Sequence, residues 1–547
     1  MHPQGVNGMR RRLSGPQVLH ERRDRHGTGR RKRKPREQCT LLRAPQRHGR
    51  PISADRDRTQ HVDRKGRSTR HEIALKQDAA PTHRSAAHHR RMAEICIIGA
   101  GPVGLGTALI LAGDGHDITV LERDEAPPSA DPEDAWEHWS RRGVPQARQI
   151  HAFIGRPRSI LRAELPAILD DLDAAGAARL DFNAPEEDLV GIGARRTTLD
   201  LVLLRHAASH PRIEVLMGIG ASGLQTGPSA RPGTPHITGV HTTAGATVDA
   251  DLVIDAAGRR SPLAKLLAAL GAAAVADDAE QDGFTYWTQW FRLIGTPPPD
   301  TALPFAHYTS FSAVRFTADA GWFAICLTGA ARDTLLRHLR DQRRFLAVAY
   351  TLPPTRDWVD PAVAVPVGPV VPMANIVSRR RRLVRDDVPC ANGAVSVGDA
   401  LACNNPMLGR GVALGLRHAQ LLRDTLRDVD ADSREFTTEF HQRTDPEVSA
   451  WYADTVGWDR SRLAGLAAAL RNDGQTQPDP RALFVHAARY DAVLYRAFLR
   501  VLGTYQPAHH VFTDPALLAR VDHLRPDLPP LPSDPLDRSG LEQLLGN

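Results

Sequence analysis

Several features that mark common protein classes are scarce in this chain of 547 residues. Its five cysteines are an odd number and include no Cys-x-x-Cys pair, which argues against a disulfide framework or a zinc site and favours a reducing cytoplasm. The histidines are dispersed and form no His-Glu-x-x-His motif, so we expect no metal. No stretch approaches the roughly 18 apolar residues of a membrane span, so we expect none. A globular cytoplasmic protein fits these absences best.

Acidic residues are scarce near the start of the chain. Residues 1–91 hold 25 Lys and Arg against 8 Asp and Glu, a net charge of +17, which leaves −10 for the remainder of a chain whose total is +7. Their apolar residues follow no helical or strand period and form no signal-peptide core, so we expect a basic disordered tail. The run Arg30–Lys34 could bind nucleic acid, although no aromatic residue is interleaved with it. A second interpretation is that the native protein starts at Met92.

The segment Glu94–Asp124 predicts a strand, a tight turn, a helix and a second strand. The first strand is the apolar run Glu94–Ile98, and the second, Asp117–Leu121, ends at Glu122. A carboxylate about 20 residues after the turn suits the hydroxyl groups of a ribose. The order of elements therefore predicts a dinucleotide-binding unit.

Three glycines occupy the turn of this unit, in the pattern Gly99-x-Gly101-x-x-Gly104. The first permits a sharp turn, the second lets the backbone approach a pyrophosphate, and the third allows the helix to pack closely on the strand. The N-terminus of the helix then offers free N–H groups to the phosphates. Glycine turns are common, but this one has the required strand, helix and terminal acid around it.

Two later segments also have a buried strand that ends in a carboxylate. Asp251–Asp255 is followed by Gly258 and a helix, and the strand from Ala394 is followed by Gly398, Asp399 and a Pro/Gly loop that opens another helix. Ligands bind at this edge of an α/β sheet, and a helix N-terminus can stabilise negative charge. The two strand ends indicate one extended cofactor, although the first is alternatively an ordinary strand-to-helix turn.

The segment Arg141–His151 follows a polar loop and leads into a helix predicted to run through about Ala175. Its arginine and glutamine side chains could hold a diphosphate or a ribityl chain, or they could lie in a solvated loop. A further helix is predicted from Arg195 to His210.

Aromatic residues make up only 5% of the chain but concentrate in Gly283–Thr296 and Ser312–Thr328. These segments predict strands of a second, antiparallel sheet. Their rings could form a substrate wall, since ligand cavities are mainly apolar and aromatic, or they could be plain core. Residues 432–547 predict helices, and we expect Trp451 and Trp458 to pack them onto the rest of the protein.

Together these motifs resemble the FAD-dependent monooxygenase superfamily of the p-hydroxybenzoate hydroxylase fold, the group A flavoproteins. The resemblance extends from Met92 to about Arg427 and rests on GAGPVG with Glu122, DLVIDAAGRRSPL and VGDALACNNPMLGRGVALG. It implies an α/β fold with a Rossmann-type FAD-binding domain built on a parallel sheet, an antiparallel-sheet substrate domain and a C-terminal helical region. The expected boundaries are residues 92–280 and 381–430 for the FAD-binding domain, 281–380 for the substrate domain and 431–547 for the helices.

The resemblance also implies which residues bind FAD. The first unit holds the ADP half, the middle Asp-Gly element lies beside the pyrophosphate, and the last strand end binds the ribityl chain, with the next loop beside the flavin ring. The implied residues are Gly99, Gly101, Gly104, Glu122, Arg123, Arg148, Asp255, Gly258, Gly398, Asp399, Pro406, Gly409 and Gly411. The chain departs from the family at Leu401-Ala402, where Ala-His is usual, and at Ala413, where Asn is often found. No catalytic acid or base is implied.

By this resemblance the protein is an FAD-dependent monooxygenase of secondary metabolism. NADH or NADPH reduces FAD, O2 forms a flavin C4a-hydroperoxide, and one oxygen atom passes to an apolar or aromatic small molecule. The alternatives are a reductase of isoprenoid double bonds and a flavin-dependent halogenase, although the WxWxIP signature of halogenases is absent. From another class, the protein could bind nucleic acid through its Arg-rich tail. The substrate, the choice of nicotinamide and the oligomeric state remain open.

Overall fold

The structure is a computed structural model that describes residues 92–547 apart from 185, 300–302, 472–479 and 547. The described residues belong to one compact unit, Ala86–Asn547. The expectations for residues 1–91, including the basic tail and its nucleic-acid binding, lie outside the described residues.

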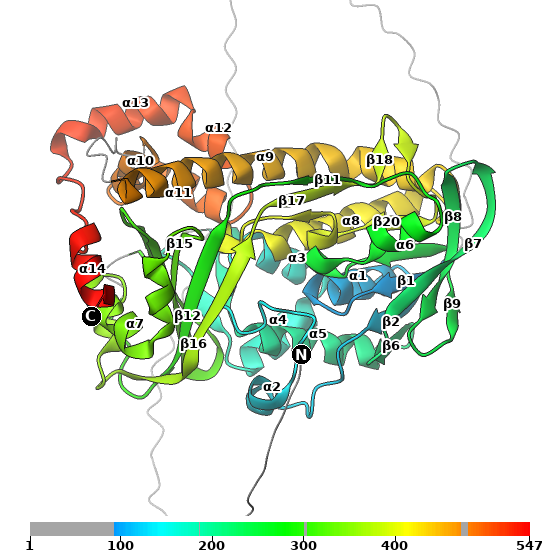
Figure 1. Ribbon diagram of the computed structural model, residues 1–547, viewed down its shortest axis with the longest axis horizontal. Coiled ribbons are helices and arrows are strands. Elements are labelled where there is room, and N and C mark those ends of the chain that lie inside the picture. Colours follow the sequence, from blue (N-terminus) through cyan, green and yellow to red (C-terminus); the bar gives the residue numbers. More distant parts are fainter. Residues whose placement is uncertain (1–91, 185, 300–302, 472–479, 547) are drawn as a thin grey trace, which may run out of the picture. The chain divides into compact units, whose positions relative to one another are not determined.

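A five-stranded parallel sheet carries the predicted nucleotide unit (Figure 1), in the order β20-β10-β1-β2-β6. Its strands are β1 (Glu94–Ile98), β2 (Asp117–Glu122), β6 (Ile213–Met217), β10 (Leu252–Asp255) and β20 (Ala394–Ser396). Four of them are short runs rich in Ile, Val and Leu, whereas β20 is Ala-Val-Ser. Apolar runs of this kind are expected for a parallel sheet that is covered on both faces. The strands predicted on either side of the glycine turn, and those before Gly258 and Gly398, are confirmed.

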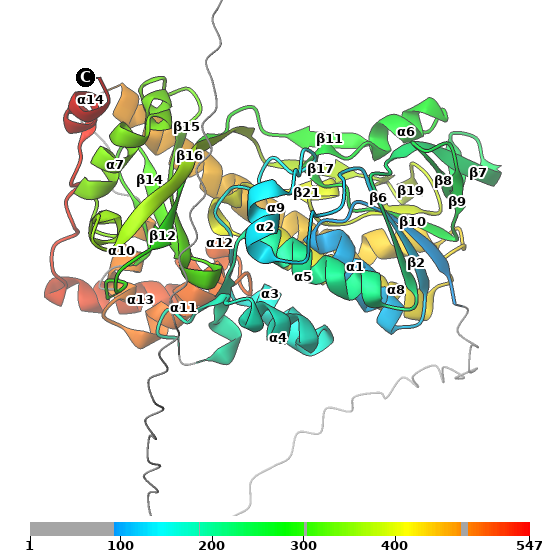
Figure 2. The ribbon, with the colours of Figure 1, turned by 90° about the horizontal axis from the view of Figure 1, so that it is seen from below.

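Three helices pack together beside this sheet, α1 (Pro102–Gly113), α5 (Arg196–Ser209) and α8 (Gly411–Asp428). Figure 2 shows α1 next to both α5 and α8, which it contacts. A Cβ atom on Gly106 would lie 2.6 Å from Leu416, and one on Gly415 would lie 2.2 Å from Val103. These two glycines therefore allow the close crossing of α1 and α8, which brings the two predicted cofactor-binding helix starts together.

A five-stranded antiparallel sheet forms the second layer, in the order β13-β14-β15-β12-β16. Its strands are β12 (Phe284–Leu293), β13 (Phe305–His307), β14 (Ser312–Thr317), β15 (Trp322–Ala330) and β16 (Ala364–Ile376). The predicted segment Ser312–Thr328 forms two of these strands. The chain reverses between them because Ala320 and Gly321 adopt left-handed backbone angles, with φ of 51° and 78°.

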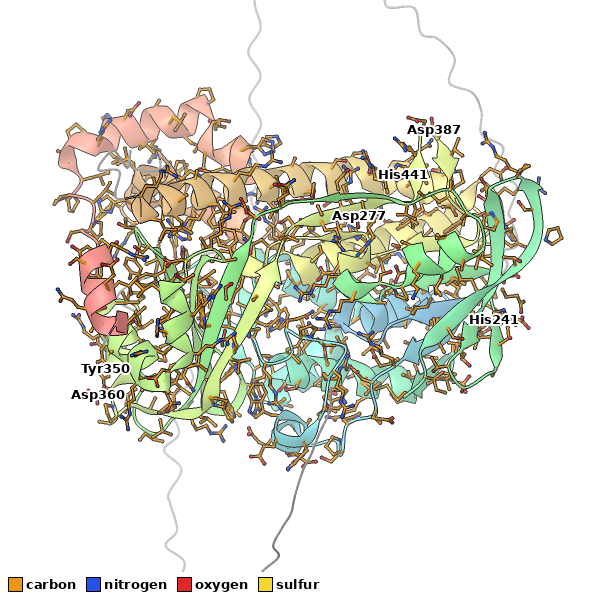
Figure 3. The ribbon with its side chains drawn as sticks, in the orientation of Figure 1. His241, Asp277, Tyr350, Asp360, Asp387 and His441 are labelled. Carbon is orange, nitrogen blue, oxygen red and sulfur yellow. The ribbon has the colours of Figure 1, made fainter. Side chains whose placement is uncertain are left out.

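Three smaller three-stranded sheets accompany these two. Their strands are β3 (Ala152–Phe153), β4 (Ala178–Leu180) and β5 (Gly191–Gly193) in one sheet, β7 (Ala221–Arg231), β8 (Thr234–Thr242) and β9 (Thr247–Asp249) in another, and β11 (Ala276–Ala279), β17 (Arg379–Arg382) and β21 (Ala402–Cys403) in a third. Asp277, labelled in Figure 3, lies on β11. Its carboxylate forms an ion pair with Arg379 of β17 at 3.3 Å, which partly neutralises the arginine-rich strand.

The single helix predicted to run to Ala175 is wrong. The chain instead forms α3 (Arg156–Glu164) and α4 (Pro166–Ala174), which are separated at Leu165. Pro166 lacks the N–H group that would continue the first helix, but its fixed φ suits the first position of the second.

Helices make up the C-terminal region, as predicted. The longest, α9 (Phe436–Leu470), contacts α8 and β20 of the parallel-sheet layer and β15 of the antiparallel sheet. It is followed by α10 (Pro480–Ala488), α11 (Ala492–Leu502), α12 (Ala508–Phe512), α13 (Pro515–Leu524) and α14 (Arg538–Gly546). The predicted fold class is therefore confirmed. None of the helices in the described residues is both long enough and apolar enough to cross a membrane.

Candidate active site

A cavity of about 1230 Å³ opens at the carboxyl ends of the parallel strands and continues beneath the antiparallel sheet. The predicted residues on its wall are Gly99, Gly101, Glu122, Arg123, Gly258, Asp399, Pro406, Gly409 and Gly411. The structure thus brings together residues from three separate motifs. Gly104, Arg148, Asp255 and Gly398, which were also predicted to bind the cofactor, do not line the cavity.

The glycine turn has the geometry of a phosphate cradle. Gly99 has φ of 111°, and a Cβ atom there would lie 2.7 Å from the carbonyl oxygen of Ala256. A Cβ atom on Gly104 would lie 1.9 Å from the carbonyl oxygen of Gly99. Gly104 therefore allows the helix to pack against the turn, although it does not line the cavity itself. Helix α1 follows its N-cap residue Gly101 and has no side-chain cap and no acidic residue in its first turn. Its first N–H groups are therefore available to an anion.

Glu122 ends β2 at the cavity wall and is only 6% exposed. Its carboxylate accepts hydrogen bonds from the backbone N–H groups of Ala100, at 2.9 Å, and Asp124, at 3.0 Å. Arg141, the first arginine of the segment Arg141–His151, lies 3.5 Å from the same carboxylate and also lines the cavity. The hydrogen bond from Ala100 in the glycine turn therefore holds in place the Glu122 carboxylate, which is predicted to bind the ribose.

Asp255 braces the sheet behind the cavity. Its carboxylate accepts hydrogen bonds from Ser261 at 2.5 Å, Ser396 at 3.2 Å and the N–H of Ala257 at 3.1 Å. Burial raises its pKa, although these hydrogen bonds oppose that shift. Asp255 therefore shapes the turn that brings Gly258 to the cavity, while its own oxygen atoms are engaged.

Asp399 lies at the cavity wall, beside the start of α8. Gly398 takes the left-handed conformation, with φ of 58°, that turns the chain there. Burial raises the pKa of Asp399, while the positive charges of Arg196 and Arg259 act against the shift. A Cβ atom on Gly411 would lie 3.3 Å from Oδ1 of Asp399, so the glycine keeps the carboxylate accessible. This carboxylate can accept a hydrogen bond from a ligand hydroxyl.

The loop before α8 presents Pro406, Gly409 and Gly411 to the cavity. Gly409 has φ of 65°, and α8 starts without a side-chain cap or an acidic residue in its first turn. Its free N–H groups therefore favour negative charge at this point of the wall. Arg410 points the other way and is fully buried, with its guanidinium 2.8 Å from Asp454 of α9.

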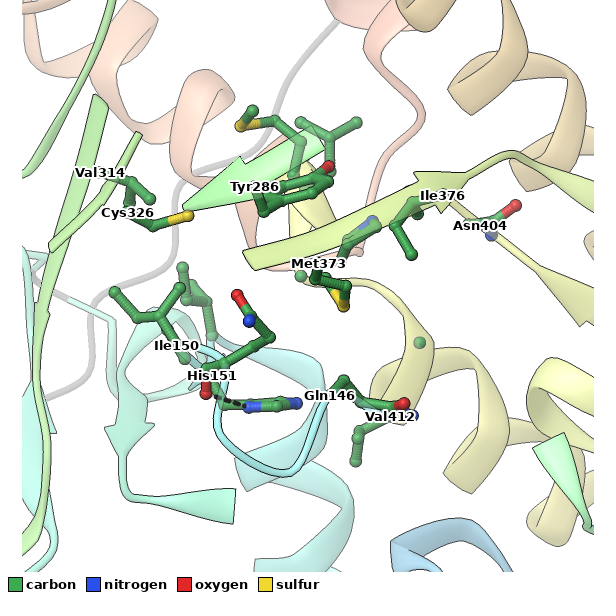
Figure 4. A pocket seen from close by; sticks show the side chains of 18 of the residues that line it. Gln146, Ile150, His151, Tyr286, Val314, Cys326, Met373, Ile376, Asn404 and Val412 are labelled. Atoms are coloured by element: carbon green, nitrogen blue, oxygen red, sulfur yellow. Dashed lines mark hydrogen bonds between the residues drawn. The ribbon is translucent and has the colours of Figure 1, made fainter. Parts of the chain in front are cut away.

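The segment Arg141–His151 divides its side chains between the cavity and the core. Gln146, Ile150 and His151 lie across the cavity from Tyr286 and Met373 (Figure 4). Burial, reinforced by the charge of Arg196, lowers the pKa of His151 to about 4, so its imidazole is neutral at ordinary pH. Arg148 instead stacks over the ring of Trp136 with its guanidinium carbon 4.0 Å from the centroid.

Only part of the aromatic concentration in the antiparallel sheet reaches the cavity. Tyr286, Phe305, Tyr308 and Phe316 line it, whereas the tryptophans of the same strands do not. The rings of Trp136, Trp290 and Trp322 form a cluster of their own, with centroids 4.9 to 6.3 Å apart. Successive side chains on a strand face opposite sides, so adjacent aromatic residues divide between wall and core. Tyr286 faces the cavity and Trp287 the core, while Trp290 and Trp322 lie on the face of Tyr286 but pack in their own cluster outside the lining. Part of the concentration is therefore core, and a substrate wall stays a prediction.

Tyr286 belongs to a buried polar network at the base of the cavity. Its hydroxyl donates to Asn405 Oδ1, and Asn405 Nδ2 donates to Asp459 of α9 at 2.6 Å. Ser378 donates to the other oxygen of Asp459 at 3.1 Å. Burial raises the pKa of Asp459 to about 6. Sequence patterns gave no signal for this network, because its members lie on one strand, one helix and two loops that are far apart in the chain.

The wall fits FAD. Two uncapped helix starts suit a diphosphate and the negatively charged edge of a reduced ring, and glycines keep both approaches open. Carboxylates that can accept hydrogen bonds from hydroxyl groups stand at Glu122 and Asp399. Arg196, which lines the cavity and bonds to Asp200 at 2.7 Å, adds positive charge between these two ends.

Comparisons with known proteins agree with this fit. A family model described as FAD dependent oxidoreductase matches residues 94–140. Protein Rv3254 of Mycobacterium tuberculosis is 26% identical over 461 residues, which cover 78% of this chain and 93% of that protein. The NAD-dependent dihydropyrimidine dehydrogenase subunit PreT of Escherichia coli is 33% identical over 79 residues, which cover 14% of this chain and 15% of that protein.

Three solved structures share the fold at 15% identity. The flavin-dependent brominase Bmp2 matches 80% of this chain and 100% of its own with a TM-score of 0.53. The Diels-Alderase PyrE3 of the pyrroindomycin pathway matches 76% and 80% with a TM-score of 0.52. The anhydrotetracycline hydroxylase OxyS from Streptomyces rimosus matches 76% of each chain with a TM-score of 0.50. The chain therefore shares the fold of these three structures, and its residues 94–140 carry the FAD dependent oxidoreductase pattern, in agreement with the resemblance predicted from the sequence.

Proposed function

We propose that the protein is an FAD-dependent monooxygenase that uses NADH or NADPH and O2 to place one oxygen atom on an apolar or aromatic small molecule. The observation that carries the proposal is the continuity of the cavity. One hollow runs from Gly99 and Glu122, past Asp399, to Tyr286 and Met373 beneath the antiparallel sheet. A cofactor bound at the first end can therefore meet a substrate at the other.

The chain's own residues bind, orient and exclude water in this proposal. The N–H groups at the start of α1 receive the diphosphate, and Asp399 accepts a hydrogen bond from a cofactor hydroxyl. Bound FAD supplies the redox chemistry: two electrons come from NAD(P)H, one oxygen atom of O2 goes to the substrate and the other leaves as water. The N–H groups at the start of α8 stabilise negative charge, while Met373, Val314 and Ile376 form an apolar wall that keeps water away.

The visible spectrum of the purified full chain tests the proposal. We expect flavin absorption that bleaches on addition of NAD(P)H and recovers in air with uptake of O2. Asp399→Ala should lose most of its bound flavin, whereas Asp357→Ala should keep it, because Asp357 lies on the surface outside the cavity lining. A colourless protein that cannot be reconstituted with FAD contradicts the proposal.

The same assay separates the related reactions. Oxidation of NAD(P)H without uptake of O2 points to a reductase, and a product that forms only with added halide points to a halogenase. We also propose a cytoplasmic location, with which the four free cysteines of the described part agree, namely Cys96, Cys326, Cys390 and Cys403.

A further inference from the structure

The cavity does not end where a flavin ring and a single aromatic substrate would meet. It continues past Val314 and Cys326, on β14 and β15, into a space between the antiparallel sheet and three C-terminal helices. Pockets for one small ligand usually occupy about 300–1,000 Å³. The whole cavity, at about 1230 Å³, exceeds that range, so it has room for a second long ligand beside a cofactor.

The far end of the cavity, here named the C-terminal chamber, has a largely apolar wall. Its apolar residues include Phe305 on β13, Val485 on α10, Phe498 and Leu502 on α11, and Phe512 on α12. These side chains belong to one hydrophobic cluster, and the rings of Phe305 and Phe498 lie 5.8 Å apart. Val485, Leu502 and Phe512 are only partly buried. An apolar ligand in the chamber would cover surface that otherwise faces water.

Polar groups near the chamber serve the protein's own structure. A ring nitrogen of His486 lies 2.8 Å from the carbonyl oxygen of Pro529. Asp534 accepts hydrogen bonds from the N–H groups of Thr309, at 2.7 Å, and Leu536, at 3.0 Å. Arg462, Arg481 and Arg489 also line the cavity. Arg462 donates to the carbonyl oxygens of Tyr308 and Phe311, and Arg481 donates to Ser461. The chamber therefore offers a ligand mainly shape and apolar area.

We propose that the substrate is an elongated, mainly hydrocarbon molecule, whose reacting end lies beneath the loop Pro406–Gly411 and whose apolar tail fills the C-terminal chamber. This inference rests on the proposed function for the reacting end. It specifies the class of substrate, since a compact single-ring molecule would leave the chamber empty. Residues from α10, α11 and α12, which follow the nucleotide motifs in the chain, then determine which substrates bind.

Binding of a homologous series tests the proposal. The probes are para-alkylphenols from para-ethylphenol to para-decylphenol, measured by calorimetry on the flavin-loaded full chain without NAD(P)H. Each methylene that enters the chamber should tighten binding about fourfold. Affinity that does not change with chain length overturns the proposal.

Variants that fill the chamber with a large side chain test whether the alkyl tail of the ligand binds there. Leu502→Trp and Ala482→Trp place a large ring at the cavity wall, and Ala482 is already exposed, so its substitution is compatible with folding. Both should remove the dependence on chain length while para-ethylphenol still binds within about twofold of the wild type. Val493→Trp is the matched control, because Val493 lies on α11 but is 43% exposed and outside the lining. Unchanged chain-length dependence in both filled variants contradicts the proposal.

The experiment separates failure of this inference from failure of the proposed function. If the protein binds no FAD, the proposed function fails, and the series still measures the chamber in the flavin-free protein. If FAD binds and is reduced by NAD(P)H but the affinities stay flat, the elongated substrate is wrong and the monooxygenase proposal stands.

Discussion

Breaking the buried ion pair between Arg410 and Asp454 should be among the costliest single changes in the protein. Arg410 is 0% exposed, its Nη2 lies 2.8 Å from Asp454 Oδ2, and its Nη1 donates to Thr455 Oγ1 at 2.8 Å. The guanidinium also stacks 4.8 Å from the ring centroid of Trp451. Asp454→Asn keeps the shape of the side chain but leaves the buried guanidinium without its counter-charge. Removal of one partner from a buried pair costs about 3–5 kcal/mol, so the free energy of unfolding should fall by that amount.

Urea unfolding followed by tryptophan fluorescence measures this loss. Asp424→Asn is the matched control: its carboxylate is 42% exposed and pairs with Arg423 at 3.0 Å, and removing such a surface pair should cost less than about 1 kcal/mol. The double variant Arg410→Met/Asp454→Leu removes both charges and should recover most of the stability. A loss below about 1 kcal/mol for Asp454→Asn would refute the reasoning, because it would mean that water reaches the guanidinium. Flavin content is a second readout, since Arg410 lies between two glycines of the cavity wall.

Three other substitutions test separate parts of the site. Gly104→Ala puts a Cβ atom 1.9 Å from the carbonyl oxygen of Gly99, so the turn must shift, and FAD affinity measured by flavin fluorescence should fall at least about tenfold. The second substitution is Asp459→Asn. Burial raises the pKa of Asp459 from 3.8 to about 6, so between these two pH values the folded protein keeps a proton on Asp459 that the unfolded chain has lost. Its stabilisation is therefore full below pH 3.8 and lost as pH rises through about 6, and relative to Asp459→Asn the wild type should lose about 3 kcal/mol of unfolding free energy across that window. Arg148→Ala should cost about 0.5–2 kcal/mol of stability through its lost contact with Trp136 and leave FAD affinity unchanged, and a large loss of FAD affinity would instead place Arg148 at the cofactor.

The parts of the fold that the sequence predicted depend on short-range patterns. The strand Glu94–Ile98, the glycine turn and the helix after it are encoded within about 20 residues. Each apolar run there is buried on both sides, so burial and local propensity agree. The same holds for the strands that end at Asp255 and Ser396. The glycines of the family pattern then predict which strand ends would meet a ligand.

The parts that the sequence missed depend on how distant segments meet. Arg148 and His151 lie three residues apart in one segment, yet one stacks on Trp136 and the other lines the cavity. The path of an irregular loop decides this, and no period encodes it. Arg196 opens a predicted helix, but only the packing of α5 against α1 brings its guanidinium within 3.5 Å of a Cβ atom placed on Gly101. Long-range packing thus selects the site residues from candidates of equal chemistry.

Helix α9 connects the two halves of the proposed mechanism. Through Asp459 it holds Asn405, and through Asp454 it holds Arg410, so both ends of the loop at the start of α8 are anchored on one helix. The same Asp454 carboxylate accepts two hydrogen bonds from His509, at the start of α12, whose Phe512 lines the C-terminal chamber. The proposed tail-binding wall and the proposed flavin-facing loop are therefore braced by the same carboxylate. A change in α9 that loosens one should also loosen the other, which is why substrate length and flavin binding are best measured together in the Asp454 variant.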